Sequence, residues 1–187
     1  LLQSSAASDV YKRQYISYAK PVEDTSTTAI IRGRFENDQL SNVVEIFAAQ
    51  ATGFGHYGGK IAFDGDGYLY LSLGDRQAPS VGVLTEHPAQ DPTNHQGVIV
   101  RLNEDGSVPD DNPFVGQAGF LPEIWTYGHR SPQGLAVHPE TGDLWETEHG
   151  PQGGDELNRI EPGRNYGWPV LGYGVNYGST GSPIHEG

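Results

Sequence analysis

A strand–turn–strand unit occurs twice in this sequence, about 75 residues apart. Aligning Gly59 with Gly134 also brings Gly67 into register with Gly142, and each of the latter lies in a turn between two short apolar runs. Short apolar runs around a glycine-containing turn are typical of a β-hairpin. A repeat of this length indicates units that bury their faces against their neighbours. The fold class is therefore predicted to be all-β.

Further short apolar runs supply the other strands of such units. Strands are predicted at 29–35, 43–48, 61–63, 68–73, 97–102, 123–127, 135–137 and 144–145. The period is long for a four-stranded propeller blade, but the polar loops 78–96 and 107–122 account for the excess. We therefore predict a fragment of about two to three blades of a β-propeller. A β-sandwich is the alternative, but it does not explain the repeat.

Composition supports this fold class and restricts the partners. The 187 residues include 26 glycines and 13 prolines, which favours short strands and turns over long helices. The formal net charge of −13 argues against a nucleic-acid or anionic-membrane surface, because those contacts need clustered lysine and arginine. The sequence has no cysteine, which excludes disulfides and thiol chemistry, and no apolar run approaches membrane-spanning length.

Both ends of the sequence differ in character from the rest. Residues 1–14 have neither an initiating methionine nor the apolar core of a signal peptide, and they resemble a translated cloning scar. We exclude 1–14 from fold prediction and assign 15–187 to one partial propeller domain. Because the last residues form a polar loop, the chain is expected to be an internal fragment. It is expected to be inactive on its own, because the missing blades would carry the remaining contacts of the site.

Polar residues are expected to gather at one end of the hairpin formed by the last two predicted strands. Two groups lie at similar distances from its turn: Arg130, Ser131 and Gln133 on one strand, and Gly150 and Pro151 on the other. Paired strands bring these groups together beside the carboxylates of Asp155 and Glu156. An oxygen-rich corner with one cation suits an anionic ligand bridged by calcium. For each residue taken singly, an ordinary surface loop is the alternative.

A histidine and an aspartate flank the first complete hairpin. His56 lies about nine residues before the centre of the turn 64–67, and Asp75 lies a similar distance after it, so both are expected at one end of the blade within hydrogen-bond reach. A carboxylate bonded to one imidazole nitrogen leaves the other nitrogen as a base near neutral pH, as oxidation of a hydroxyl requires. From spacing alone, a loop histidine bonded to the backbone remains the alternative.

Two other metal motifs are weak. The Asp-Gly-Asp-Gly run at 64–67 is interpreted as a hairpin turn rather than an EF-hand loop, because the remaining ligands and the closing glutamate are absent. The other histidines considered do not have the spacing of a zinc site; they are His87, His95, His129, His149 and His185.

Four motifs in the second half of the chain form a characteristic set. They read Gly-His-Arg-Ser-Pro-Gln-Gly at 128–134, Glu-His-Gly-Pro at 148–151, Asp-Glu-Leu-Asn at 155–158 and Asn-Tyr-Gly-Trp-Pro at 165–169. The set resembles the pyrroloquinoline-quinone-dependent soluble aldose sugar dehydrogenases of the glucose/sorbosone dehydrogenase family. One departure is Ser131, where the family usually has asparagine. The resemblance extends from about residue 29 to the C-terminus and implies a six-bladed propeller.

The resemblance also implies roles for individual residues. His56 matches the general base of the family, and Asp75 matches its partner. The implied quinone contacts are Arg130, Ser131, Gln133 and Tyr177, the last by stacking near the cofactor. The implied calcium ligands are the carbonyls of Gly150 and Pro151 at the quinone, and Glu156 with the carbonyl of Tyr166 at a second, structural site.

The implied reaction is oxidation of an aldose at its C1 hydroxyl to the lactone, with the sugar as substrate and an external electron acceptor as partner. A calcium-dependent propeller lactonase is one alternative, and it would not need the arginine and amide corner. A non-catalytic ligand-binding propeller is the other, and it predicts no pairing between His56 and Asp75. By resemblance alone, the location is periplasmic or secreted and the full-length protein is a candidate homodimer.

Overall fold

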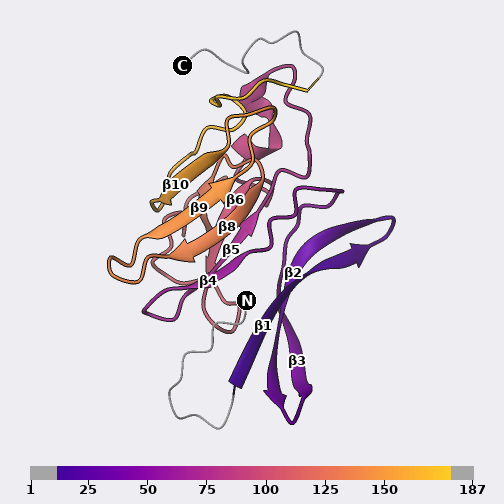
Figure 1. The fold of residues 1–187 in the computed structure, drawn as a ribbon, viewed down its shortest axis with the longest axis vertical. Helices are drawn as coiled ribbons and strands as arrows, with labels where there is room; N and C mark the ends of the chain where they lie inside the picture. Colours follow the sequence, from indigo (N-terminus) through magenta and orange to yellow (C-terminus); the bar gives the residue numbers. More distant parts are fainter. Residues whose placement is uncertain (1–11, 178–187) are drawn as a thin grey trace.

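The apolar runs form three antiparallel sheets in the computed structural model, which describes residues 12–177. Ten strands and two short 3-10 helices occur in this part of the chain (Figure 1). Within it, no helix has the length and apolar character needed to cross a membrane. The all-β prediction is therefore confirmed.

The central sheet is the complete four-stranded unit that the sequence predicts. Its strands pair in chain order as β4 (Ile61–Phe63), β5 (Leu69–Leu73), β6 (Val98–Leu102) and β7 (Ile124–Tyr127). Each strand begins and ends within one residue of its predicted bounds. The run 64–67 is the tight turn between β4 and β5, where the Gly67 N–H donates to the Asp64 carbonyl (3.3 Å).

β5 separates two apolar cores, because its side chains alternate between the faces of the sheet. Its three leucines share one core with Ile30 of the N-terminal sheet. Tyr70 points to the other face and packs with Leu144 and Ile160 of the C-terminal sheet. All five residues of β5 are buried, as expected for a strand that is covered on both faces.

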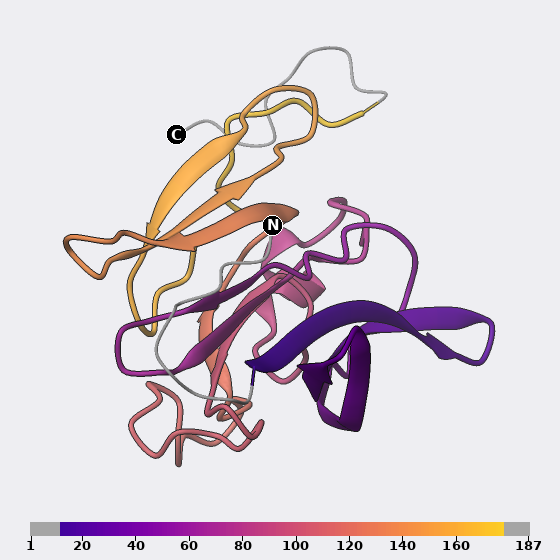
Figure 2. The ribbon, with the colours of Figure 1, turned by 60° about the horizontal axis from the view of Figure 1, so that its bottom comes forward.

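The C-terminal sheet contains the second copy of the repeated hairpin. It has the order β10 (Glu156–Ile160), β9 (Leu144–Glu148) and β8 (Pro132–Val137). β8 packs against β4 and β5, so the two repeats lie next to each other as neighbouring blades do (Figure 2). β10 is not among the strands predicted from the sequence, although Arg159-Ile160 resembles Arg101-Leu102 at the end of β6.

The N-terminal sheet contains one strand more than the sequence predicts. Its strands are β1 (Lys12–Val22), β2 (Thr25–Glu36) and β3 (Gln39–Ala48), with β2 in the middle. β2 and β3 were expected, whereas β1 was not, and β1 begins within the segment 1–14 that was left out of the fold prediction. β1 forms because it pairs along its whole length with β2, from Lys12 opposite Phe35 to Val22 opposite Thr25.

The loop 78–96 is more ordered than its polar composition predicts. It contains two 3-10 helices, η1 (Leu84–Glu86) and η2 (Pro88–Gln90). His87 caps η2, because its side chain accepts a hydrogen bond from the Ala89 N–H (3.1 Å). At the end of η2, Gln90 donates to the carbonyl of Trp168 (2.7 Å) and therefore ties this loop to the segment after β10.

Candidate active site

His56 and Asp75 form a direct pair at the end of the β4–β5 hairpin. The distance from His56 Nδ1 to Asp75 Oδ1 is 2.6 Å, and the Asp75 side chain is only 1% exposed. The same carboxylate oxygen accepts the Gln77 N–H (2.9 Å). The expectation that the two side chains approach within hydrogen-bond reach is therefore confirmed.

The local backbone explains why this pair forms here. A Cβ on Gly74 would lie 2.1 Å from the carbonyl oxygen of His56, so only glycine allows the His56 backbone to approach the strand end. His56 itself has a φ of +39°, in the left-handed region that non-glycine residues rarely adopt. Such conformations cluster at functional sites. The pair is held in place by close packing of the backbone.

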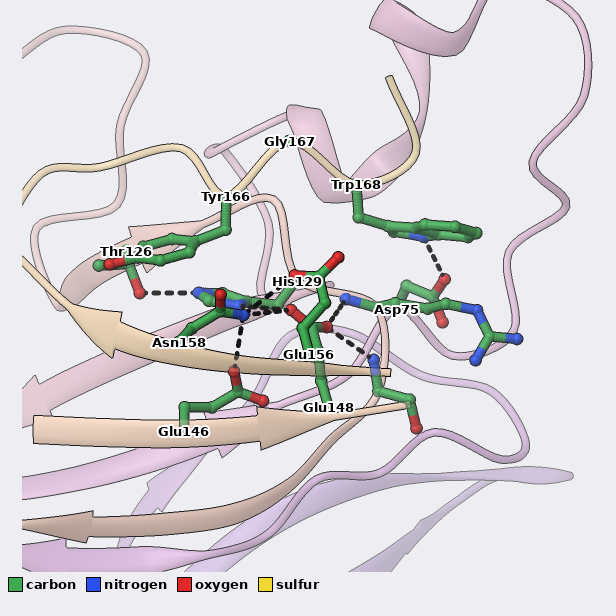
Figure 3. Close-up of polar contacts among 12 residues, drawn as sticks. Asp75, Thr126, His129, Glu146, Glu148, Glu156, Asn158, Tyr166, Gly167 and Trp168 are labelled. Carbon is green, nitrogen blue, oxygen red and sulfur yellow. Dashed lines mark hydrogen bonds and ion pairs between the residues drawn. The ribbon is translucent and has the colours of Figure 1, made fainter. Parts of the chain in front are cut away.

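The other carboxylate oxygen of Asp75 is occupied by a residue to which the sequence assigned no role. The indole Nε1–H of Trp168 donates to Asp75 Oδ2 over 2.8 Å (Figure 3). Trp168 belongs to the motif 165–169, but the two residues are far apart in the sequence, and their contact joins the end of β5 to the segment after β10. No local spacing indicates it.

A cavity of about 990 Å³ opens beside the pair. Eight of the predicted site residues line it: His56, Asp75, Arg130, Ser131, Gln133, Gly150, Pro151 and Tyr177. Asp155, Ser80 and Trp168 also contribute to its wall. The β4–β5 and β8–β9 hairpins therefore bring their polar ends to one cavity.

Arg130 is the main cationic group of this cavity. Its Nη1 donates to the carbonyls of His149 (2.9 Å) and Gly150 (2.8 Å), and its guanidinium lies 5.2 Å from the centre of the Trp168 ring. Its Nε is buried and has no hydrogen-bond partner among residues 12–177. A buried donor without a partner is a group that a polar ligand can satisfy.

The two predicted calcium-binding carbonyls already accept hydrogen bonds. The Gly150 carbonyl accepts from Arg130, and the Pro151 carbonyl accepts from the Tyr177 hydroxyl (3.1 Å). Tyr177 is otherwise 71% exposed, as suits a ring that a bound ligand would cover. Because a carbonyl oxygen has two lone pairs, each keeps one for a cation.

Glu156 and Tyr166 lie outside this cavity, in a second polar cluster (Figure 3). Glu156 was expected beside Asp155 at the arginine corner. Asp155 does line the cavity, but Glu156 begins β10, and successive side chains of a strand point to opposite faces. The Tyr166 ring stacks on the imidazole of His129, with 4.7 Å between ring centres.

The second cluster holds the backbone of Arg130 and Ser131, which form the arginine corner of the cavity. Glu148 accepts the backbone N–H groups of Arg130 (2.5 Å) and Ser131 (3.2 Å) through one oxygen. Its other oxygen lies 3.3 Å from His129 Nδ1. The ligating atoms of His129, Glu146 and Glu148 lie within 4.8 Å of one another, so strand pairing gathers a metal-type donor set that the histidine spacing did not indicate.

The side-chain amide of Asn158 hydrogen-bonds three carboxylates in this cluster. Asn158 donates to Glu146 (3.3 Å), Glu148 (3.3 Å) and Glu156 (3.1 Å). Burial raises the pKa of Glu146 to about 9, with a further contribution from Glu148, and one of its oxygens is buried without a hydrogen-bond partner among the described residues. Burial also raises the pKa of Glu156. The cluster therefore contains more carboxylate oxygens than its hydrogen-bond donors satisfy.

Replacing Glu146 by glutamine is expected to flatten the pH dependence of stability. A carboxyl whose pKa is higher in the folded than in the unfolded state binds its proton more tightly when folded, so stability falls as pH rises from about 4.5 through about 9. Glu146→Gln removes this loss, so the stability of the variant relative to the wild type is expected to rise between pH 5 and pH 9 by on the order of 5 kcal/mol. Urea unfolding in chelator-treated buffer measures the free energy of unfolding at each pH. The same dependence of this free energy on pH in Glu146→Gln and the wild type would contradict the burial argument. The control is Glu140→Gln, since Glu140 is exposed.

The sequence and the fold match known proteins over most of the described chain. The profile of the family described as Glucose / Sorbosone dehydrogenase matches residues 5–187. The aldose sugar dehydrogenase YliI of Escherichia coli is 42% identical over 184 residues, which cover 94% of this chain and 47% of the relative. Quinoprotein glucose dehydrogenase B of Acinetobacter calcoaceticus is 37% identical over 149 residues, which cover 73% and 30%.

Two solved structures show the same fold. The apo-form of the soluble aldose sugar dehydrogenase from Escherichia coli has a TM-score of 0.80 at 41% identity, covering 88% of this chain and 47% of that one. The PQQ-bound form of the aldose sugar dehydrogenase from Streptomyces coelicolor has a TM-score of 0.71 at 31% identity, covering 85% and 44%. The predicted fold class, part of a β-propeller, is therefore confirmed, and the chain spans about half the length of the relatives it matches. The chain belongs to the glucose/sorbosone dehydrogenase family.

Proposed function

We propose that the protein oxidises aldose sugars at the C1 hydroxyl to the lactone, with pyrroloquinoline quinone as the hydride acceptor and calcium as its bridging cation. The observation that carries this proposal is the His56–Asp75 pair at the wall of a cavity shared with Arg130. A relative described as a quinoprotein and a solved relative in its PQQ-bound form support the cofactor. Because the chain spans about half the length of its relatives, the activity is proposed for the complete protein.

His56 is the general base of the proposed reaction. Asp75 accepts the Nδ1 proton, which fixes the tautomer and leaves Nε2 as the basic nitrogen. Nε2 takes the proton of the C1 hydroxyl while the C1 hydride departs, so the alcohol carbon becomes the lactone carbonyl. When bound, the quinone supplies the two-electron acceptor and calcium polarises it.

The residues of the cavity fit a polyanionic quinone. Arg130 offers a guanidinium with a free buried Nε, and Ser131 and Gln133 add neutral polar groups to the same wall. The carbonyls of Gly150 and Pro151 would hold the calcium, since calcium accepts backbone oxygen ligands.

The second cation site is proposed at the acidic cluster. Glu156 would bind calcium there together with the carbonyl of Tyr166. The excess of buried carboxylate around Asn158 supports a cation at this place. Its role would be structural, because the cluster holds the backbone of Arg130 through Glu148.

Both alternatives account for less of the observed geometry. A propeller lactonase has no need for the arginine and amide corner, and a non-catalytic propeller has no need for a histidine paired with a buried aspartate. Reduction of an artificial dye by the complete protein, with aldose, quinone and calcium, tests the proposal. Lactone hydrolysis without quinone would support the lactonase instead. We also propose that the complete protein is periplasmic or secreted, which cell fractionation tests, and that it is a homodimer, which sedimentation tests. The isolated chain is expected to show no turnover in the same dye assay.

Replacing Arg130 by lysine is expected to weaken quinone binding by about tenfold, because lysine keeps the charge but loses the planar, multi-donor head. Titration of the apoprotein with the quinone, followed by its absorbance, measures the dissociation constant. Arg164→Lys is the matched control, since Arg164 is an exposed arginine that pairs with Glu161 away from the cavity. Equal affinity of Arg130→Lys and the wild type would remove Arg130 from the cofactor site.

A further inference from the structure

We propose that Trp168 is a positioning residue for the His56–Asp75 pair, acting through the hydrogen bond from its indole N–H to Asp75 Oδ2. The inference rests on the proposed function, because it assigns Trp168 a task in presenting His56 as a base. It adds a third member, from the segment after β10, to a pair that the sequence places in one hairpin.

The Asp75 carboxylate has a separate partner on each side. Oδ1 lies 2.6 Å from His56 Nδ1 and accepts the Gln77 N–H, whereas Oδ2 accepts Trp168 Nε1–H at 2.8 Å. The torsion that turns an aspartate carboxylate is soft, so the carboxylate plane is set by its donors. Trp168 therefore sets the plane in which Oδ1 meets the imidazole.

The position of the Trp168 indole is fixed by hydrogen bonds to both backbone polar groups of the residue. The Trp168 N–H donates to the Gly128 carbonyl (2.8 Å), and the Trp168 carbonyl accepts from Gln90 Nε2 (2.7 Å). The ring is 6% exposed, with the Arg130 guanidinium near its face and the His87 ring at 6.2 Å, edge-on. A ring fixed in this way can direct its single donor at one acceptor.

The segment that carries Trp168 is packed too closely to shift. A Cβ on Gly128 would lie 2.1 Å from Asn165 Oδ1 and 2.9 Å from the Tyr166 nitrogen. The side-chain amides of Asn165 and Gln90 also bond each other reciprocally, at 2.7 and 3.1 Å. The Nε1–H direction is thus determined by β7, η2 and the segment after β10 together.

If Trp168 only packed against its neighbours, removing its indole N–H while keeping its shape would leave His56 unaffected. A substitution that changes this one group therefore distinguishes a packing role from a positioning role. Replacing Trp168 by benzothienylalanine puts sulfur in place of the N–H and keeps the bicyclic shape. Trp168→Phe is a second variant that also lacks the donor. Trp145→Phe in β9 is the matched control, since it changes a tryptophan outside the cavity.

The experiment is NMR of the His56 ring in the complete apoprotein, with steady-state kinetics of the quinone-loaded enzyme as a second readout. With benzothienylalanine, the His56 Nδ1 proton is expected to exchange with solvent about tenfold faster or more, because its acceptor is no longer oriented. Turnover is expected to fall about tenfold while KM stays within twofold. Trp145→Phe is expected to change neither quantity.

An unchanged Nδ1 exchange rate in a folded benzothienylalanine protein would overturn the proposal, even if Trp168→Phe fails to fold. The two readouts also separate this inference from the proposed function. Faster exchange in a protein that shows no sugar oxidation at all would uphold the positioning role and refute the dehydrogenase role. An unchanged exchange rate in the benzothienylalanine protein, together with sugar oxidation by the wild type, would refute the positioning role and uphold the dehydrogenase role.

Discussion

Replacing His56 by alanine is expected to lower turnover by about a hundredfold or more while the quinone still binds, because a general base contributes about that factor. The imidazole Nδ1 of His56 pairs directly with the buried Asp75 carboxylate. Dye-coupled sugar oxidation by the quinone-loaded complete protein measures turnover, and absorbance titration measures cofactor affinity. Asp75→Asn should lose a similar factor, since the amide no longer secures the correct tautomer.

The control for this result is another histidine in a hairpin. His138 is exposed and accepts the N–H groups of Glu140 and Thr141 within its own turn. His138→Ala is expected to retain turnover within about twofold, because only a local turn is weakened. Equal turnover in His56→Ala and the wild type would remove His56 from the mechanism and leave the cavity a binding site.

Replacing Glu148 by alanine is expected to destabilise the fold by about 3–5 kcal/mol, because a buried charged acceptor is removed from several donors. The donors left without it are the backbone N–H groups of Arg130 and Ser131 and the His129 ring. The change is expected to abolish quinone binding as well, since the backbone of the arginine corner loses its anchor. Urea unfolding followed by tryptophan fluorescence measures the free energy.

A second glutamate separates this effect from simple charge removal. Glu140 is exposed in the β8–β9 turn, and Glu140→Ala is expected to change stability by less than about 0.5 kcal/mol. A loss below about 1 kcal/mol in Glu148→Ala would mean that water or another group replaces the carboxylate. The buried cluster would then not support the corner.

The sequence predicts those features that depend on local spacing. The strands of the central sheet follow from alternation and turn residues, and the His56–Asp75 pair follows from equal distances to one turn. The convergence of Arg130 with Gly150 follows in the same way from the second hairpin. In each case the two halves belong to one hairpin, where the register is set by the turn.

The remaining features depend on contacts between sheets. Trp168 reaches Asp75 from the segment after β10, and no spacing rule relates two residues that meet only when neighbouring sheets pack. The face taken by Glu156 depends on where β10 begins, which a polar sequence with few apolar residues does not indicate. β1 was missed because its first three residues fall in the excluded segment 1–14 and the run Tyr15–Val22 was not recognised as a strand, although it pairs with β2.

The double burial of β5 limits how the protein can vary in length. Leu69, Leu71 and Leu73 face one core and Tyr70 faces the other. Inserting or deleting one residue between Leu69 and Asp75 would therefore turn the side chains that follow to the opposite face and move the Asp75 carboxylate away from His56. The turn 64–67 and the polar loop 107–122 carry no such constraint. Length differences among relatives should therefore gather in those two segments, while the distance from the first leucine of β5 to the aspartate stays constant, and tags or inserted domains belong in the loops.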